Sequence, residues 1–148
     1  MKYRKATPKD LNRLSELFDA YRIFYRKPTD IESAKTFLEE RISNKDSELF
    51  VAENAETKLV GFVQLYPLFS STRMKKFWLL NDLFVHPDSR SKGVSIGLIE
   101  IAKTLVVESN ACGMCLETEK SNLIGNNLYP KTGFELNTSA NFYEWSVK

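Results

Sequence analysis

The sequence predicts a mixed fold of the α/β or α+β class, with helices packed on a central sheet. Three observations support this prediction. Several segments carry apolar residues at the spacing of an amphipathic helix, others carry the bulky and β-branched residues typical of strands, and the two kinds of segment alternate along the chain. The predicted order is a strand, two helices, three strands, a helix, a strand, a helix and one or two final strands.

Two amphipathic helices are predicted near the N-terminus. Thr7, Pro8 and Asp10 form a capping pattern that starts the first helix. Thr29 and Glu32 form a capping box that starts the second helix, which is expected to end near residue 43 or 44. Their apolar faces consist of Leu11, Leu14, Phe18, Tyr21 and Tyr25 in the first helix, and Ile31, Ala34, Leu38 and Ile42 in the second.

The later elements follow from the same patterns. A third amphipathic helix is expected from Gly93 onward, and a fourth around residues 122–129. Strands are expected at residues 3–5, 48–52, 60–66, 77–85 and 114–118, and residues 142–147 are expected to form a final strand.

Length, composition and charge limit the kind of protein. The chain has 148 residues, a usual size for one domain, and 43% of them are hydrophobic. No apolar run approaches the roughly 18 residues that cross a bilayer. A formal net charge of +2 is too small to favour a nucleic-acid partner. We therefore expect a single domain over residues 1–148, cytoplasmic, with neither membrane nor nucleic acid as a partner.

A strand-to-helix turn is the most informative segment. Residues 77–85 suit a buried strand that ends before Pro87, and a helix opens at Gly93. The N–H groups of residues 90–95 are expected at the helix N-terminus, where the helix dipole and the small Gly93 favour a closely bound phosphate. Arg90 and Lys92 add positive charge. The alternative is a turn that only reverses the chain, and neither the dinucleotide fingerprint nor the Walker loop is present.

A second motif lies beyond the strand expected at residues 114–118. It has Asn122, Gly125 and Tyr129 at helical spacing and is completed by Leu128, Gly133 and Phe134. Together the two segments resemble the GNAT superfamily of N-acetyltransferases, which transfer an acetyl group from acetyl-coenzyme A to an amine. The places of that family's first motif are taken here by Val85, Pro87, Arg90, Gly93 and Ser95, with Ser95 where Gly or Ala is usual.

The resemblance implies a fold, a co-substrate and a binding region. The fold is a mixed, mostly antiparallel central sheet of 6–7 strands flanked by about four helices. Acetyl-CoA is the co-substrate, and no metal is expected. The residues implied to bind acetyl-CoA are Phe84, Val85, Arg90, Ser91, Lys92, Gly93, Val94, Ser95, Asn122 and Tyr129.

The resemblance also implies catalytic roles in the second motif. Tyr129 corresponds to the proton donor to the coenzyme A sulfur, and its alternative role is that of a core tyrosine. Asn122 is expected to contact the pantetheine arm or the acceptor, although an asparagine before a helix also serves as an N-cap. Pro130 is expected to bend the helix, because it lacks an N–H group and disfavours helical geometry at the preceding residue.

Amine acetylation requires a group that removes a proton. At pH 7 only about one alkylamine in 10³ is neutral, since its pKa is about 10.4. The strand expected at residues 77–85 is similar to that of the small-amine and polyamine branch of the GNAT superfamily. That branch carries Glu-Asp where this chain has Asn81 and Asp82. Asp82 is the predicted base, because asparagine accepts no proton at neutral pH. The alternatives are a water relay, an acceptor that arrives neutral, or a structural salt bridge at Asp82.

The acceptor is expected to be a primary amine. A small molecule, polyamine-like or amino-acid-like, and a protein lysine all fit, and Tyr25, Asn81 and Asp82 are the predicted acceptor-binding residues. The resemblance implies direct attack in a ternary complex. A non-catalytic module that binds coenzyme A or acyl-coenzyme A is the alternative function, and an unrelated nucleotide-phosphate binder is a weaker one. Residues 142–147 suggest a homodimer through an exposed strand edge.

Cys112 and Cys115 form a Cys-x-x-Cys pair. No second pair exists and His86 is the only histidine, which disfavours zinc. The pair enters a strand instead of opening a helix, which disfavours redox chemistry. We expect buried structural thiols.

Overall fold

The computed structural model describes residues 1–148, which divide into two compact units. Unit 1 is Met1–Glu117 and unit 2 is Thr118–Lys148. All of the strands belong to unit 1, where they form one five-stranded sheet in chain order. The strands are β1 (Lys2–Lys5), β2 (Glu48–Glu53), β3 (Leu59–Ser70), β4 (Lys75–Val85) and β5 (Met114–Cys115). Neighbouring strands are antiparallel except β4 and β5, which are parallel.

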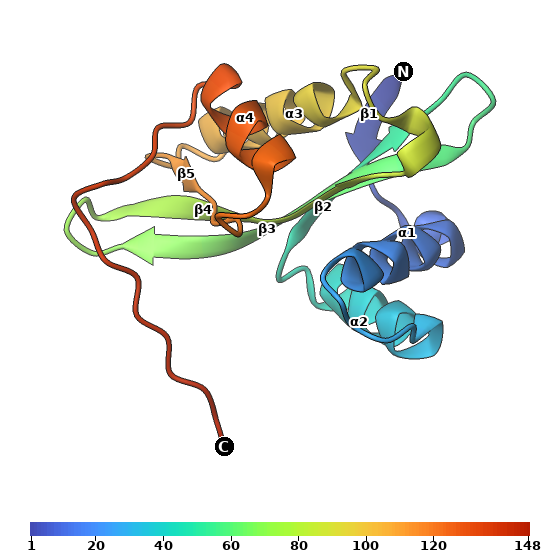
Figure 1. The fold of residues 1–148 in the computed structure, drawn as a ribbon, viewed down its shortest axis with the longest axis horizontal. Coiled ribbons are helices and arrows are strands. Elements are labelled where there is room, and N and C mark those ends of the chain that lie inside the picture. The colour runs from blue at the N-terminus through green and yellow to red at the C-terminus, as the bar shows by residue number, and fades with distance from the viewer. The chain divides into compact units, whose positions relative to one another are not determined.

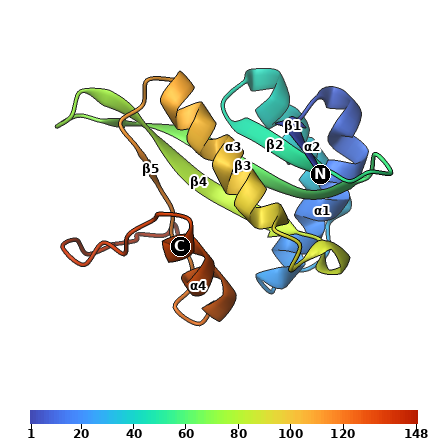
Figure 2. The same cartoon turned by 90° about the horizontal axis from the view of Figure 1, so that it is seen from above.

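Helices cover both faces of the sheet in unit 1. The helices α1 (Leu11–Phe24) and α2 (Ile31–Asn44) lie on one face, and α3 (Val94–Glu108) lies on the other (Figure 1). Seen from above, α3 runs across β3 and β4 (Figure 2). The core between the sheet and the α1/α2 pair includes Leu14, Phe18, Leu38, Phe62 and Phe84. None of the helices is both long and apolar enough to cross a membrane.

The start of α1 confirms the predicted capping pattern, whereas the start of α2 differs from it by one residue. Thr7 and Asp10 form a capping box around the short 3-10 turn Pro8–Asp10 that leads into α1. The N-cap of α2 is Asp30, whose carboxylate accepts a hydrogen bond of 3.1 Å from the Ser33 N–H. Thr29 was the wrong choice because its hydroxyl is used elsewhere, in a 2.6 Å bond to Asp19.

The predicted sheet of 6–7 strands is wrong, because five strands are present. The difference includes residues 142–147, which form no strand and pair with no other segment. Their sequence suits a strand, with Phe142 and Trp145 both largely exposed. A strand is stabilised by its ladder of hydrogen bonds and by cross-strand side-chain pairs, so a strand-like sequence alone does not form one.

A β-bulge interrupts the pairing of β3 with β4. Gln64 pairs with Asp82, but the next residue, Leu65, pairs with Leu80. Asn81 is therefore an extra residue in β4, without a partner across the strand pair.

The bulge changes which face of the sheet the side chains of β4 cover. Before it, the Trp78 indole donates a 2.8 Å hydrogen bond to the Ser109 hydroxyl at the end of α3. After it, the Phe84 ring lies 6.3 Å from the ring of Tyr21 on α1. Residues 78 and 84 would share a face in a regular strand, because side chains alternate with a period of two. The extra residue turns Asp82 and Phe84 toward α1.

Unit 2 contains one helix, α4 (Leu123–Lys131). Its N-cap is Asn122, whose side-chain oxygen accepts a 3.1 Å bond from the Gly125 N–H. Pro130 is the last residue but one of this helix. The helix ends just after it, where the Thr132 N–H still bonds to the Leu128 carbonyl at 3.1 Å.

Candidate active site

The turn between β4 and α3 presents a run of unpaired backbone donors. The N-cap of α3 is Gly93, in the left-handed region with φ 75°, and Ser91 is also left-handed with φ 60°. The first helical bond joins the Gly97 N–H to the Gly93 carbonyl at 3.1 Å. The N–H groups of residues 91–96 donate no hydrogen bond within the protein. Such donors at a helix N-terminus favour an anion, and the helix dipole adds to the attraction.

Two cationic side chains brace this turn. The Arg90 Nε donates a 3.0 Å bond to the Val85 carbonyl, and its guanidinium lies 5.6 Å from the centre of the Phe84 ring. The Lys92 Nζ donates a 2.9 Å bond to the Asp88 carbonyl. Both charges therefore stay beside the turn, where they strengthen its attraction for phosphate. The predicted phosphate-binding segment is thus a formed structure, and its donor set suits the diphosphate of coenzyme A.

Asp82 is a buried carboxylate held by uncharged groups. Its residue is 4% exposed. Gln64 Nε2 donates to Oδ2 at 2.8 Å, Asn81 Nδ2 donates to Oδ1 at 3.0 Å, and the Tyr21 hydroxyl also bonds to the carboxylate. No ion pair includes Asp82, so a structural salt bridge does not explain it. Burial raises the pKa of this carboxyl, and the hydrogen bonds oppose part of the rise.

A polar network lies behind Asp82 on β3. Gln64 Oε1 accepts a 3.0 Å bond from the Ser47 hydroxyl, and Gln64 Nε2 also lies 3.0 Å from the Tyr66 hydroxyl oxygen. Burial, together with the negative charge of Asp82, raises the pKa of Tyr66 to about 12. Sequence reasoning missed Gln64. Its signal was a lone polar residue in an apolar strand, fully buried in the structure.

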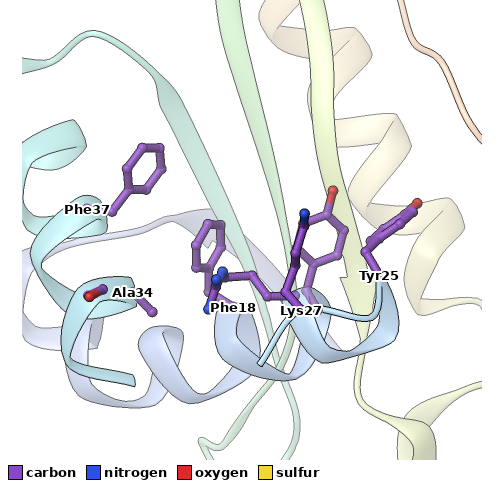
Figure 3. A pocket seen from close by; sticks show the side chains of 8 residues that line it. Phe18, Tyr25, Lys27, Ala34 and Phe37 are labelled. Atoms are coloured by element: carbon purple, nitrogen blue, oxygen red, sulfur yellow. The ribbon is translucent and has the colours of Figure 1, made fainter. Parts of the chain in front are cut away.

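A cavity of about 460 Å³ lies between α1 and α2 in unit 1 (Figure 3). Tyr25, the predicted acceptor residue at the end of α1, lines it. Tyr21 also lines it and reaches the other predicted acceptor residues, because its hydroxyl bonds to Asp82 and lies 3.4 Å from the Asn81 carbonyl oxygen. Unit 1 therefore brings Tyr25, Asn81 and Asp82 to one side of the sheet.

Unit 2 carries the second motif. The Asn122 amide is occupied by the helix cap and by a 2.9 Å bond from its Nδ2 to the Thr118 hydroxyl. A Cβ on Gly125 would lie 2.7 Å from the Asn122 amide nitrogen, so the tight cap requires glycine there. The Tyr129 ring packs edge-on against Phe134, with 5.8 Å between ring centres.

The two cysteines are free and only partly buried, so the expectation of buried thiols is corrected. Cys115 lies in β5, and Cys112 precedes that strand by two residues. Burial raises the pKa of the Cys115 thiol, which makes it a poorer nucleophile at neutral pH.

Comparison with known proteins shows the family. The family model described as acetyltransferase (GNAT) family matches residues 14–134. A Bacillus subtilis (strain 168) protein named Uncharacterized N-acetyltransferase YhfO is 39% identical over 138 residues, which cover 93% of this chain and 92% of that protein. A Haemophilus influenzae protein named Probable acetyltransferase is 29% identical over 147 residues, 99% of each chain.

Solved structures agree with this result. A crystal structure described as that of a probable acetyltransferase matches with a TM-score of 0.95 and 34% identity, covering 100% of this chain and 99% of the other. The chain belongs to the GNAT family of acetyltransferases, which confirms the resemblance found in its sequence. It is an acyltransferase that uses acetyl-CoA as its donor.

Proposed function

We propose that this protein transfers the acetyl group of acetyl-CoA to a primary amine by direct attack in a ternary complex. The acceptor is a small molecule or a protein lysine. The observation that carries the proposal is the run of unpaired N–H groups at residues 91–96, in the same unit as the buried carboxylate Asp82. Residues 1–148 act as one catalytic domain in this proposal.

The turn before α3 holds the donor. Its N–H groups bind the diphosphate of acetyl-CoA, and Arg90 and Lys92 supply long-range attraction. Ser91 and Gly93 both adopt a left-handed backbone in this turn, which Gly93 does without steric cost because it has no Cβ. Phe84 and Val85 end the strand beneath the turn, and Val94 and Ser95 contribute through their backbone in the first turn of α3.

Asp82 accepts the proton that the amine loses. The amine nitrogen attacks the thioester carbonyl carbon, the carbon–sulfur bond breaks, and the proton passes to Asp82 directly or through one water molecule. The raised pKa of Asp82 suits this role, because a base works best when its pKa approaches the working pH. Asn81 presents its backbone at the bulge on the same side and contributes to acceptor binding.

Tyr129 completes the reaction by donating its phenolic proton to the leaving sulfur. Solvent then restores the proton on the phenol. Asn122 acts as a positioning residue, because its side chain fixes the start of the helix that carries Tyr129.

The runner-up function is a regulatory module that binds coenzyme A without catalysis. One observation that favours it is Asn81, which stands where the polyamine branch carries a glutamate. Another is the 4% exposure of Asp82, which limits the access of an acceptor to the carboxylate at the bulge. Cytoplasmic location and homodimer formation stay predictions from the sequence.

The discriminating experiment mixes the pure protein with acetyl-CoA and a panel of acceptors, and measures released thiol. The panel contains a monoamine, a polyamine, an amino acid and a lysine peptide, so it also tests the resemblance to the polyamine branch. Thiol release that depends on the acceptor supports the transferase. Thermal stabilisation by acetyl-CoA with no acceptor-dependent release supports the binding module.

A further inference from the structure

The cavity between α1 and α2 is aromatic and of small-molecule size. Its volume of about 460 Å³ lies in the range of sites that enclose a small ligand. Phe18, Tyr21, Tyr25 and Phe37 form most of its wall, as Figure 3 shows for three of them. Such a wall accommodates an apolar side chain, and its ring faces also attract an ammonium group.

The charged residues that line this cavity are all basic. They are Arg22 and Lys27, and no lining residue is acidic. The nearest acid on α1 is Asp19, which is 4% exposed and already engaged. It accepts a 2.6 Å bond from the Thr29 hydroxyl and a 2.7 Å bond from the Asp30 N–H, and Arg22 lies 3.7 Å from it. Asp19 balances the charge of Arg22, so the charge that the cavity offers to a ligand is that of Lys27, and no lining carboxylate is present for a second cation.

The same contacts fix the loop that carries Lys27. Asp19 anchors the far end of the α1–α2 loop through Thr29 and Asp30. At the near end, the Lys27 N–H bonds to the Arg22 carbonyl at 3.0 Å, and the Arg22 guanidinium donates to the Pro28 carbonyl at 3.1 Å. The backbone that carries Lys27 is thus fixed beside the cavity, which lowers the entropy cost of ligand recognition.

Tyr21 connects the cavity to the proposed base. Its ring lines the cavity, and its hydroxyl bonds to the Asp82 carboxylate on β4. An amine bound beside this ring lies next to the group that takes its proton. Asp82 thus lies beyond the Tyr21 side chain, and Lys27 belongs to the cavity lining itself.

We infer that the acceptor is an amino acid with an apolar side chain. Its carboxylate pairs with Lys27, its side chain packs among the rings, and its amine faces Tyr21 and Asp82. This inference rests on the proposed acetyl transfer and narrows its acceptor class. It argues against a polyamine, whose second ammonium would meet positive charge.

The test compares acceptors that differ only in the carboxylate. Phenylalanine is measured against phenethylamine, and leucine against 3-methylbutylamine, with spermidine as the polyamine. Acetyl transfer gives kcat/KM for each, and calorimetry gives Kd for each in the presence of coenzyme A. We expect each amino acid to exceed its decarboxylated partner by about tenfold or more in both measurements, since a charge-assisted hydrogen bond is lost with the carboxylate.

The variants Lys27→Met and Lys9→Met complete the design. Both remove one lysine charge from unit 1, but Lys9 is exposed and does not line the cavity. Lys27→Met is expected to reduce the preference for the carboxylate at least fivefold, whereas Lys9→Met retains it. Equal use of each matched pair, or a preference for spermidine, overturns the inference while acetyl transfer stands. Binding that prefers the amino acid and needs Lys27, without turnover, overturns the transferase and keeps the ligand class. Neither binding nor turnover overturns both.

Discussion

Gln64 and Asp82 face each other across β3 and β4, and the Gln64 amide donates a 2.8 Å hydrogen bond to the Asp82 carboxylate. A neutral amide orients the acid without supplying a positive charge to compensate it. The acid is therefore strongly desolvated and keeps a raised pKa, whereas the pKa of Asp10, which pairs with Arg4, is lowered.

Substitution Asp82→Asn should reduce turnover by about 10²-fold or more, because it removes the base and keeps the size of the side chain. The affinity for acetyl-CoA should stay within about twofold. Steady-state kinetics and calorimetry measure the two quantities, and Asp46→Asn, at an exposed site in unit 1, is the matched control. Unchanged turnover in the variant would remove Asp82 from the mechanism.

The same residue should set the acid limb of the pH profile. Asp82 accepts a proton only when it is ionised, so kcat falls as the pH decreases through its pKa. Since that pKa is raised, the fall should lie above the usual range of an aspartate. The profile of Asp82→Asn should lack this limb, and a limb that persists in the variant would assign it to another group.

Asp10 has a lowered pKa, the opposite of Asp82, and its charge should affect the stability of the fold. The Arg4 guanidinium makes two bonds of 2.8 Å to its carboxylate and, with the Thr7 N–H, lowers the Asp10 pKa to about 2. A lowered pKa stabilises the fold above the unfolded value near 4, and this stability is lost as the pH falls from about 4 to 2. The contribution is about 2 kcal/mol at pH 7.

The measurement is urea unfolding of Asp10→Asn at pH 7 and near pH 3. The variant should be less stable than the parent at pH 7, and the difference should shrink in acid. Glu39→Gln, an exposed acid on α2 without an ion pair, should change stability little at either pH. A deficit in Asp10→Asn that is equal at both values would show that packing, and not charge, sets its cost.

The backbone donors of the turn can be tested with proline at Ser95. Proline is tolerated in the first turn of a helix, so Ser95→Pro removes one N–H donor with little harm to α3. We expect the Kd for coenzyme A to rise about tenfold or more, because a hydrogen bond to a charged group contributes about 1.5–3 kcal/mol. Ser95→Ala removes the hydroxyl and keeps the N–H, so it should bind nearly as tightly. Equal losses would assign the effect to the hydroxyl, and no loss in either variant would place the diphosphate elsewhere.

Tyr129→Phe tests the proton donor in unit 2. The substitution keeps the ring that contacts Phe134 and removes only the hydroxyl. Turnover should fall by about 10²-fold while the Kd for acetyl-CoA changes little. Tyr143→Phe, at a site 86% exposed in the same unit, should retain turnover. Full activity of Tyr129→Phe would leave this tyrosine with a packing role only.

Elements specified by local chemistry were predicted well from the sequence. The Thr7/Asp10 capping box and the end of α2 at Asn44 agree with the structure, because a cap depends on residues only a few positions apart. The turn before α3 was predicted equally well, since Gly93 and the helix that follows it define its backbone locally. Its binding of phosphate stays a prediction.

Features that depend on distant partners were not predictable in this way. The helix cap at Asp30 depends on Asp19, eleven residues earlier. The Asp19 carboxylate accepts hydrogen bonds from the Thr29 hydroxyl and the Asp30 N–H. The role of the buried Gln64 amide can be recognised only when the pairing of β3 with β4 is known, because that pairing brings it to Asp82. The bulge at Asn81 cannot be recognised from the sequence of β4 alone, because the strand register is set by the packing of both faces of the sheet.

That single inserted residue also affects how this chain should be compared with others. A regular alternation of side chains along β4 would place Trp78 and Asp82 on the same face of the sheet. In the structure, Trp78 contacts the end of α3 on one face and Asp82 contacts α1 on the other. An alignment displaced by one position here would equate the acid with Asn81 or with the partly buried Leu83. A catalytic role can therefore be carried from one relative to another only when the alignment also matches the bulge residue.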